Sequence, residues 1–327
     1  MQKKSVSIVI PNYNGRKLLE QNLPSAFSAL HEAEVEFEFI ISDDASTDDS
    51  LDFIKSTYPD IIILESIINK GFSPTINKGI RIASKDLIYV LNSDVCLTPK
   101  YFHYLFSYFD SSDTFGVTGQ FIGIDDDKIQ DGGKYPHLTI SNKIQPINFY
   151  PEKEGDFKIP TLYLSGGGSL IDRRKLQLLD GFDEIFAPFY VEDLELSIRA
   201  WRAGWKCYYE HRAICRHPVS ATISNYHNQR KIWIITQRNK LTLHSLHLEN
   251  RSKLLWYLRQ SITFIFQGIV FRHKYHEAFF QFLARRKEIK NSKTKYEKLF
   301  GSGLLSIESV MTNLRYEIEQ HKIVKFK

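Results

Sequence analysis

A run of five apolar residues, Leu87–Leu91, ends abruptly in the polar triplet Asn92-Ser93-Asp94. Five apolar residues without alternation predict a strand buried on both faces, as in the parallel sheets of α/β proteins. Ligands of such open sheets gather at the carboxyl ends of the strands. Asp94 therefore has two interpretations: a carboxylate that holds a divalent metal against a diphosphate, or a cap in the turn before Thr98.

The rest of the first half alternates between strand and helix character. Strands are expected at 6–10, 37–42, 61–64 and 87–91, and helices at 17–30, 50–57 and 75–82. This rhythm predicts an α/β fold with a Rossmann-like, mostly parallel sheet and helices on both faces. Further along, Leu194, Ile198 and Trp201 recur at helical spacing, and a last strand is expected at 206–210.

Charge divides the chain into two parts. Residues 225–327 hold 20 Lys and Arg against 7 Asp and Glu, whereas residues 1–224 hold 23 against 31. We therefore expect an acidic α/β domain at 1–224 and a basic, aromatic, helical region at 225–327. A basic region suits an anionic partner, either nucleic acid or a membrane surface. No nucleic-acid motif accompanies it, and nucleic acid is not expected as a partner.

Helices are expected in the basic region at 232–248, 254–271 and 278–283. The second is nearly long enough to cross a bilayer, but Arg259, Gln260 and the basic residues on both flanks argue against a membrane span. Two interpretations remain open for this region. It is either an interfacial amphipathic surface that contacts an anionic membrane, or a helical subdomain packed on the body.

The cellular location follows from two simpler features. Met1-Gln2-Lys3-Lys4 leads straight into a strand-like segment without resembling a signal peptide. Cys96, Cys207 and Cys215 form no CxxC pair, so neither a zinc site nor a disulfide framework is indicated. We expect a cytoplasmic protein, at the inner face of the membrane if the interfacial interpretation holds.

Five polar clusters occur in a fixed order along the chain. They are Pro11-Asn12-Tyr13-Asn14-Gly15, then Asp43-Asp44-Ala45-Ser46-Thr47-Asp48, then Asn69-Lys70-Gly71-Phe72 with Asn77-Lys78-Gly79, then Asn92-Ser93-Asp94, and finally Gly181-Phe182-Asp183-Glu184 with Glu192-Asp193-Leu194-Glu195 and His217. Over residues 5–218 this set resembles the family-2 glycosyltransferases, inverting enzymes of the GT-A fold, and most of all their rhamnosyltransferase and O-antigen branch. Gln237-Arg238-Asn239 resembles the same family more weakly.

The resemblance implies a reaction and its participants. The donor would be a nucleotide-diphosphate sugar, UDP- or dTDP-linked, and the cofactor Mg²⁺ or Mn²⁺. The acceptor would be a hydroxyl of a cell-surface glycan or of a lipid-linked precursor. A different class remains open, a non-catalytic sugar-nucleotide or glycan-binding protein on the same scaffold, which would bind the donor without turnover. A dehydrogenase is excluded because no G-x-G-x-x-G follows the first strand.

Donor-binding roles follow from the resemblance and from side-chain chemistry. Tyr13 would stack on the base, with Pro11 shaping the strand end beside it. Asp43 or Asp44 would accept from the N3–H of uracil or thymine, although Asp44 also suits a helix cap. The remaining residues expected to contact the nucleotide are Asn14, Asn69, Gly71, Asn77 and Ser93.

Asp94 matches the last Asp of the family's D-x-D motif and is the expected metal ligand. Asn92 stands where many members have Asp, which implies one carboxylate fewer near the metal. His217 matches a C-terminal histidine that contacts the metal or the diphosphate in several relatives. Its alternative role is that of a structural histidine.

On the acceptor side, Asp193 is the expected general base, because inversion needs one carboxylate opposite the leaving group. Glu192 would hydrogen-bond the acceptor or the donor sugar, and the choice of Asp193 over Glu192 rests on the family pattern. Gly166, Gly167 and Gly168, which suit either a ligand's close approach or a tight bend, and Trp205 are the expected sugar-binding residues. The hypothesis requires Asp94 and Asp193 to meet in one cleft.

Overall fold

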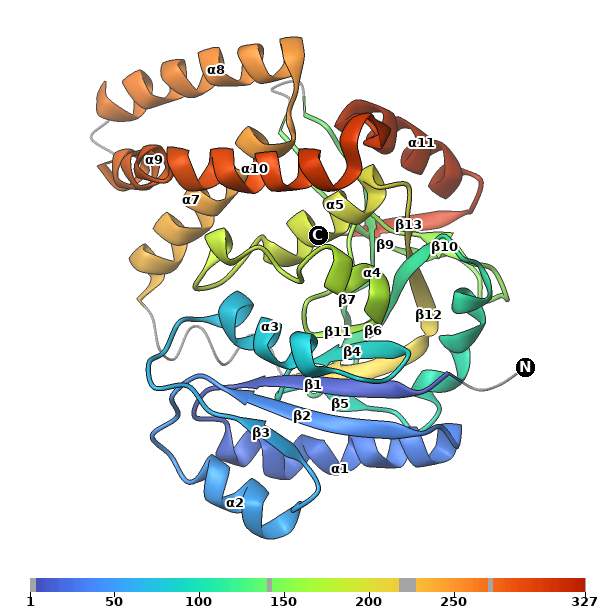
Figure 1. Ribbon diagram of the computed structural model, residues 1–327. Coiled ribbons are helices and arrows are strands. Elements are labelled where there is room, and N and C mark those ends of the chain that lie inside the picture. Colours follow the sequence, from blue (N-terminus) through green and yellow to red (C-terminus); the bar gives the residue numbers. More distant parts are fainter. Residues whose placement is uncertain (1–3, 140–142, 218–227, 270–272, 327) are drawn as a thin grey trace.

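The computed structural model describes residues 4–139, 143–217, 228–269 and 273–326. At its centre is a sheet with the strand order β10-β12-β6-β11-β4-β1-β2-β3 (Figure 1). The strands are β1 (Val6–Asn12), β2 (Phe37–Asp43), β3 (Ile62–Leu64), β4 (Leu87–Leu91), β6 (Thr114–Gly123), β10 (Ile159–Pro160), β11 (Gly168–Asp172) and β12 (Lys206–His217). Two short strands, β5 (Cys96–Leu97) and β7 (Ile129–Asp131), pair with β12 and β6.

This sheet is mostly parallel, as the sequence predicts. β1 pairs in parallel with β2 and β4, and β6 with β12, whereas β11 runs antiparallel to both β4 and β6. The carboxyl ends of the parallel strands and the start of β11 therefore share one edge, on the left in Figure 1. Because the polar clusters of the sequence follow strand ends, this edge collects them.

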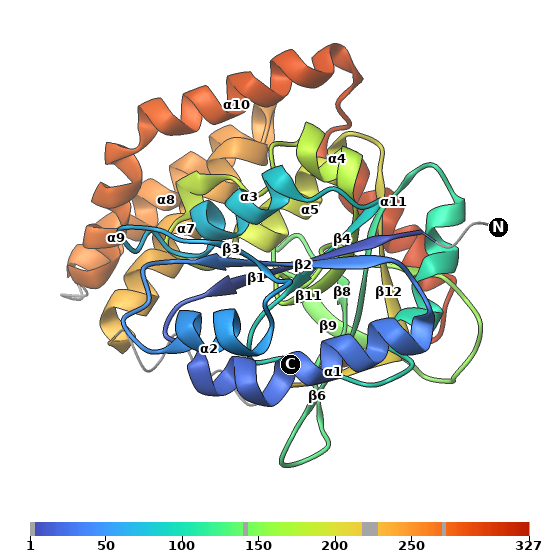
Figure 2. The same cartoon turned by 60° about the horizontal axis from the view of Figure 1, so that its bottom comes forward.

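Helices cover both faces of the sheet (Figure 2). One face carries α1 (Arg16–Ala33) and α2 (Ser50–Thr57), and the other carries α3 (Phe72–Ile82), α4 (Arg173–Leu178) and α5 (Glu192–Arg202). Each strand contributes to two cores: Ile8 and Ile10 pack in the cluster that contains α1, and Val9 packs in the one that contains α3. Burial on both sides accounts for the unbroken apolar run of β4.

The C-terminal region is helical, as expected. Its elements are α7 (Gln229–His247), α8 (Asn250–Ile269), α9 (His273–Ala284), α10 (Arg286–Phe300), α11 (Ile307–Glu319) and β13 (Ile323–Phe326). β13 completes a second sheet with β9 (Ile147–Pro151) and β8 (Gly133–Tyr135). Four short 3₁₀ segments complete the described elements: Tyr101–Tyr104, Phe106–Asp110, Glu184–Phe186 and Gly301–Gly303.

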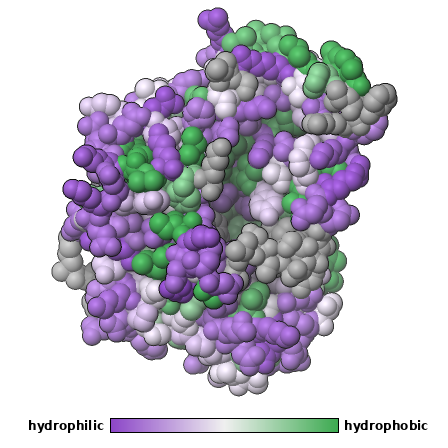
Figure 3. All heavy atoms as spheres, turned by 180° about the vertical axis from the view of Figure 1, so that it is seen from behind, coloured by the Kyte–Doolittle hydropathy of each residue, from purple (hydrophilic) through white to green (hydrophobic). Residues whose placement is uncertain are grey.

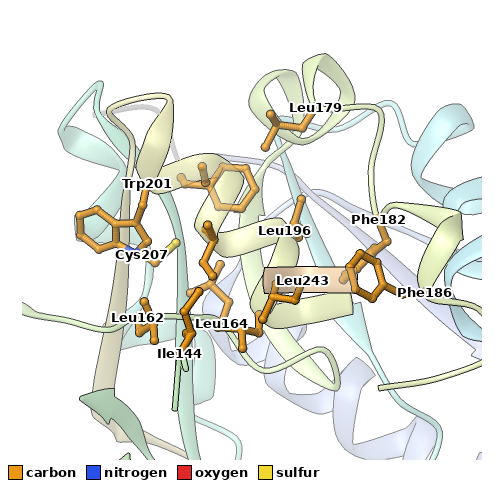
Figure 4. Packing of buried hydrophobic residues seen from close by; sticks show 14 of the residues in the cluster. Ile144, Leu162, Leu164, Leu179, Phe182, Phe186, Leu196, Trp201, Cys207 and Leu243 are labelled. Carbon is orange, nitrogen blue, oxygen red and sulfur yellow. The ribbon is translucent and has the colours of Figure 1, made fainter. Parts of the chain in front are cut away.

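This region shares a core with the α/β body. Leu243 of α7 lies in one buried cluster with Leu196 of α5 and Phe186 (Figure 4). The boundary expected at 224–225 lies outside the described residues, but the helices beyond it pack as part of the body. Within the described ranges, none of the helices combines the length and the apolar character that crossing a bilayer requires.

Candidate active site

The ends of β1 and β2 are joined by a polar network. The Asn12 side chain donates to Asp43 Oδ1 (2.9 Å), and the Ser46 hydroxyl (2.5 Å) and amide (2.9 Å) also donate to the Asp43 carboxylate. Asn14 Oδ1 accepts from the Thr47 amide at 2.7 Å. Asp43 and Asn14 therefore hold together the turns that follow β1 and β2. Pro11 and Tyr13 lie at the same strand end, and Ser93 Oγ lies next to Gly15.

Asp44 holds the loop that precedes α3. Its two carboxylate oxygens accept from the amides of Lys70 and Gly71, both at 2.8 Å, beside the exposed Asn69. The N-cap of α2 is Asp49, so Asp44 does not cap that helix. Gly71 has a φ of +89°, and a Cβ at this position would lie 2.4 Å from Pro188 Cα. Only glycine fits between this loop and residues 187–188.

Asn77 has a structural role, which corrects the expectation that it contacts the nucleotide. Its Nδ2 donates to the Phe182 carbonyl at 2.8 Å, and its Oδ1 accepts from the Phe182 amide at 2.9 Å. The residue is only 2% exposed. Both polar atoms of its amide are thus committed to the backbone of the Gly181-Phe182 turn, and we leave Asn77 out of the nucleotide set.

Asp94 and His217 meet at the carboxyl edge. Asp94 follows β4, His217 is the last residue of β12, and His217 Nε2 lies 3.4 Å from Asp94 Oδ2. The other ring nitrogen, Nδ1, lies 3.3 Å from Gln130 Oε1, so the side-chain amide of Gln130 orients the imidazole. The sequence carried no signal for Gln130, which β7 brings to this place.

This pair fits a divalent cation. A carboxylate and an imidazole are both ligands for Mn²⁺, and Mg²⁺ is commonly held by one or two carboxylates with the remaining positions left to substrate phosphates and water. In the part of the chain that the structure describes, no third His, Cys, Asp or Glu completes a cluster there. The remaining coordination positions of such a site would be filled by the substrate rather than by the protein.

The triple glycine at 166–168 contacts both Asn92, which precedes Asp94, and Asp193. The Gly167 carbonyl accepts from the Asn92 amide at 3.0 Å, two residues before Asp94. A Cβ on Gly166 would lie 3.4 Å from Asp193 Cβ and 3.7 Å from its carboxylate Oδ2. Asp94 and Asp193 therefore flank one glycine turn on the same side of the molecule.

Glu192 and Asp193 begin α5 and differ in electrostatic setting. Burial raises the pKa of Glu192 from 4.5 to about 8, and the charge of Asp193 adds to this rise. Burial also raises the pKa of Asp193, but the amides of Leu194 and Gly166 and the charge of Lys134 oppose the rise. Two amides and a cation therefore favour the ionised form of Asp193, whereas burial and the neighbouring Asp193 charge favour the protonated form of Glu192.

A buried lysine that the sequence analysis did not single out faces this end of the site. Lys134 is 2% exposed, its ammonium contacts the Asp131 carboxylate, and it donates to Asn148 Oδ1 at 2.6 Å. It also lies 5.2 Å from the centre of the Tyr163 ring. Burial lowers its pKa, whereas Asp193 and the touching Asp131 favour the charged form. A charged Lys134 would in turn stabilise an ionised Asp193.

Arg238 and Asn239 of α7 hold the segment just before Glu192. The Asn239 side-chain amide is fully buried and lies within hydrogen-bond distance of the carbonyls of Phe186 (2.7 Å), Phe189 (3.0 Å) and Tyr190 (2.9 Å). Arg238 donates to the Ala187 carbonyl at 2.6 Å and to Asn239 Oδ1. Arg238 and Asn239 of the Gln237-Arg238-Asn239 motif therefore clamp the backbone of residues 186–190.

Trp205 lies elsewhere, which corrects its assignment as a sugar-binding residue. It packs parallel to Phe115 and edge-on to Phe300. Trp205 precedes the first residue of β12, whereas His217 is its twelfth. Because β12 pairs with ten residues of β6, from Thr114 to Gly123, the two ends of this strand are roughly 30 Å apart at about 3.3 Å per residue. Trp201 is also in the core, where its indole donates to the Thr161 carbonyl (Figure 4).

The architecture is of the GT-A type. One solved structure with this fold is GalNAc-T7 with UDP, GalNAc and Mn²⁺, with a TM-score of 0.67, 15% identity and coverage of 98% of this chain and 58% of that one. Another is S. aureus TarS 1-349 in complex with UDP-GlcNAc, with a TM-score of 0.54, 13% identity and coverage of 95% and 92%.

The protein belongs to glycosyl transferase family 2, whose model matches residues 7–179. Among curated relatives, a poly(ribitol-phosphate) beta-glucosyltransferase of Bacillus spizizenii is 36% identical over 94 residues, which is 27% of this chain. A poly-beta-1,6-N-acetyl-D-glucosamine synthase of Staphylococcus epidermidis is 23% identical over 277 residues, 78% of this chain. The aligned parts span only 14% and 63% of these two relatives.

Proposed function

We propose that the protein is a metal-dependent, inverting glycosyltransferase. It would move a sugar from a UDP- or dTDP-linked donor to a hydroxyl of a cell-surface glycan or of a lipid-linked precursor. The observation that carries this proposal is the convergence of two separate groups on one glycine turn. Asp94, which contacts His217, follows the Asn92 amide that bonds to the Gly167 carbonyl, and Asp193 lies against Gly166.

The donor nucleotide would lie along the ends of β1, β2 and β4. Asp43 already accepts three hydrogen bonds from within the protein, whereas Asp44 accepts two. A carboxylate has about four acceptor positions, so Asp44 keeps more capacity for the N3–H of a pyrimidine. Tyr13 would stack on that base, and Asn69 and Ser93 would contact the ribose or the phosphates.

Asp94 and His217 would hold the divalent cation, with Gln130 fixing the imidazole. A bound Mg²⁺ or Mn²⁺ would supply charge neutralisation for the departing diphosphate. Two solved structures similar to this chain, GalNAc-T7 with UDP, GalNAc and Mn²⁺ and the mannosyltransferase PcManGT with GDP-Man and Mn²⁺, support a divalent cation beside the donor. Asn92 would contribute no charge here, so the metal site would contain one carboxylate from this motif.

Asp193 would take the proton of the acceptor hydroxyl. As that oxygen bonds to the anomeric carbon, the bond from this carbon to the diphosphate oxygen breaks, and the configuration inverts in a single step. The amides of Leu194 and Gly166 and the charge of Lys134 favour an ionised Asp193 before the reaction. The raised pKa of Glu192 favours its protonated form, which would donate a hydrogen bond to the sugar or the acceptor.

Thermal shift and product analysis together test this proposal. A panel of nucleotide sugars is added with and without Mn²⁺, because a ligand of the native state raises the melting temperature. The donor that gives a metal-dependent shift is then incubated with acceptors or water, with Asp193→Asn as the matched variant. We expect the variant to keep the thermal shift and to lose transfer. Near-wild-type turnover by Asp193→Asn would refute its role, and donor binding without any turnover by the wild type would favour a non-catalytic binding protein.

A further inference from the structure

One face of α8 is apolar along the whole length of the helix. Six of its side chains are more than half exposed: Leu254, Leu258, Ile262, Ile265, Phe266 and Ile269. Their spacing, mostly of three or four residues, places them in one stripe, called here the α8 face. Trp256 and Gln260 lie on the opposite side of the helix and are buried. Figure 3 shows apolar surface gathered over this helix at the top of the molecule.

An exposed stripe of this kind needs an occupant. Monomeric proteins rarely leave contiguous apolar patches of this length in water, and such patches mark interaction surfaces. The packing of α8 confirms that the stripe points away from the body. Its inner side meets α9, where Gln260 accepts from the Tyr275 hydroxyl at 2.9 Å and Phe264 contacts Phe279. The α8 face is therefore not needed for the fold of the chain itself.

The charges around the stripe are positive. Residues 250–269 contain no Asp or Glu, Arg251 is exposed near the start of the stripe, and Arg259 flanks it. In the adjacent α9, Lys274 is exposed, and the single acidic residue, Glu277, is paired with Arg230 of α7. An apolar stripe framed by cations is the pattern of helices that lie in the plane of a membrane interface.

Charge distinguishes the two candidate partners of the α8 face, a second copy of the chain and a lipid surface. A second copy of the chain would bring two regions with 20 basic and 7 acidic residues each against one another, which like charges oppose. A surface of anionic lipids accepts both the apolar side chains and the cations. We infer that the α8 face docks the protein on an anionic lipid surface, with its six apolar side chains at the boundary between headgroups and acyl chains and with Arg251 and Arg259 against lipid phosphates.

Vesicle cosedimentation with the full chain tests this inference. The vesicles contain phosphatidylcholine alone or phosphatidylcholine mixed with phosphatidylglycerol, and the variant is Ile262→Glu/Ile265→Glu. The matched control, Leu178→Glu/Tyr316→Glu, adds the same charge at exposed apolar positions on α4 and α11. We expect the wild type and the control to bind the anionic vesicles, binding to weaken as salt is raised, and the α8 variant to lose about tenfold or more.

Two further measurements make every outcome informative. Circular dichroism and melting temperature show whether the α8 variant keeps its fold, and the exposure of both residues predicts that it does. A wild type that does not sediment with anionic vesicles, or that binds both kinds equally, overturns the inference. So does a stable wild-type dimer in sedimentation velocity that the α8 variant dissociates. None of these measurements depends on turnover, so the docking inference and the proposed glycosyltransferase function are tested separately.

Discussion

The clamp on the segment before Glu192 yields a prediction that compares two asparagines of the same helix. Asn239 lies inside α7, is fully buried and serves three backbone carbonyls of residues 186–190. Asn228 caps the exposed start of α7, where its side chain accepts from the Lys231 amide at 2.8 Å. Replacing each by alanine removes the same side chain from the same helix in opposite environments.

The expected losses of stability differ several-fold. The two amide protons of Asn239 make at most two full hydrogen bonds, and each buried group left unsatisfied costs about 1–3 kcal/mol. The loss for Asn239→Ala is therefore about 2–6 kcal/mol, before any cost of the cavity. Losing an N-cap costs about 1 kcal/mol, which is the expectation for Asn228→Ala. Since whole proteins are stable by about 5–15 kcal/mol, the first change is severe and the second is mild.

Urea unfolding followed by circular dichroism measures both losses. A thermal shift with the nucleotide-sugar donor then reports on the proposed site. The held segment contacts the start of α3, which follows the proposed donor-binding residues Asn69 and Gly71: the Pro188 carbonyl accepts from the Phe72 amide at 2.8 Å. We expect Asn239→Ala to weaken donor binding and Asn228→Ala to leave it unchanged. If Asn239→Ala loses no more stability than Asn228→Ala, the clamp does not hold the segment and the reasoning fails.

Three further predictions concern the site. Asp94→Asn should remove the Mn²⁺-dependent part of the donor's thermal shift while a metal-independent part remains, and an unchanged Mn²⁺ effect would exclude Asp94 as a ligand. Because burial raises the pKa of Glu192 from 4.5 to about 8, the folded protein retains a proton that the unfolded chain releases between these pH values. The contribution of Glu192 to the free energy of unfolding therefore falls as pH rises through that window. In urea midpoints measured against pH, Glu192→Gln should reduce this slope, and an unaltered slope would contradict the raised pKa. Trp205→Phe should leave donor affinity and turnover unchanged, since the residue lies at the other end of β12, and a specific loss of turnover would contradict that placement.

The parts of the fold that the sequence predicts are those with local signals. The run Leu87–Leu91 is a strand with those same bounds, and the helix at 50–57 is also found as expected. The second sheet had no such signal, because β13 at 323–326 pairs with β9 at 147–151. A pairing across more than half of the chain depends on tertiary packing rather than on local pattern.

Within the candidate site, the order of motifs along the chain predicts that Asp94, His217, Asp193 and the glycine turn act together, and their roles in binding and catalysis stay predictions. Motif order could not predict which polar atoms the fold itself uses. Asn77 has the right residue type for a ligand contact, but the Phe182 backbone occupies its amide. Gln130 and Lys134 show the converse, since they come from the irregular middle of the chain and acquire neighbours only through β7 and β8.

The C-terminal helices connect the proposed docking surface with the site through a short path. Glu249, which lies between α7 and α8, receives a hydrogen bond from Arg202 at the end of α5. The other end of α5 begins with Glu192 and Asp193, and α7 clamps the segment before them. A surface that fixes the orientation of α8 would therefore also fix the orientation of the carboxyl edge of the sheet. An acceptor anchored in that same surface would then approach Asp193 from one constant direction, which is the condition for in-line attack on the donor sugar.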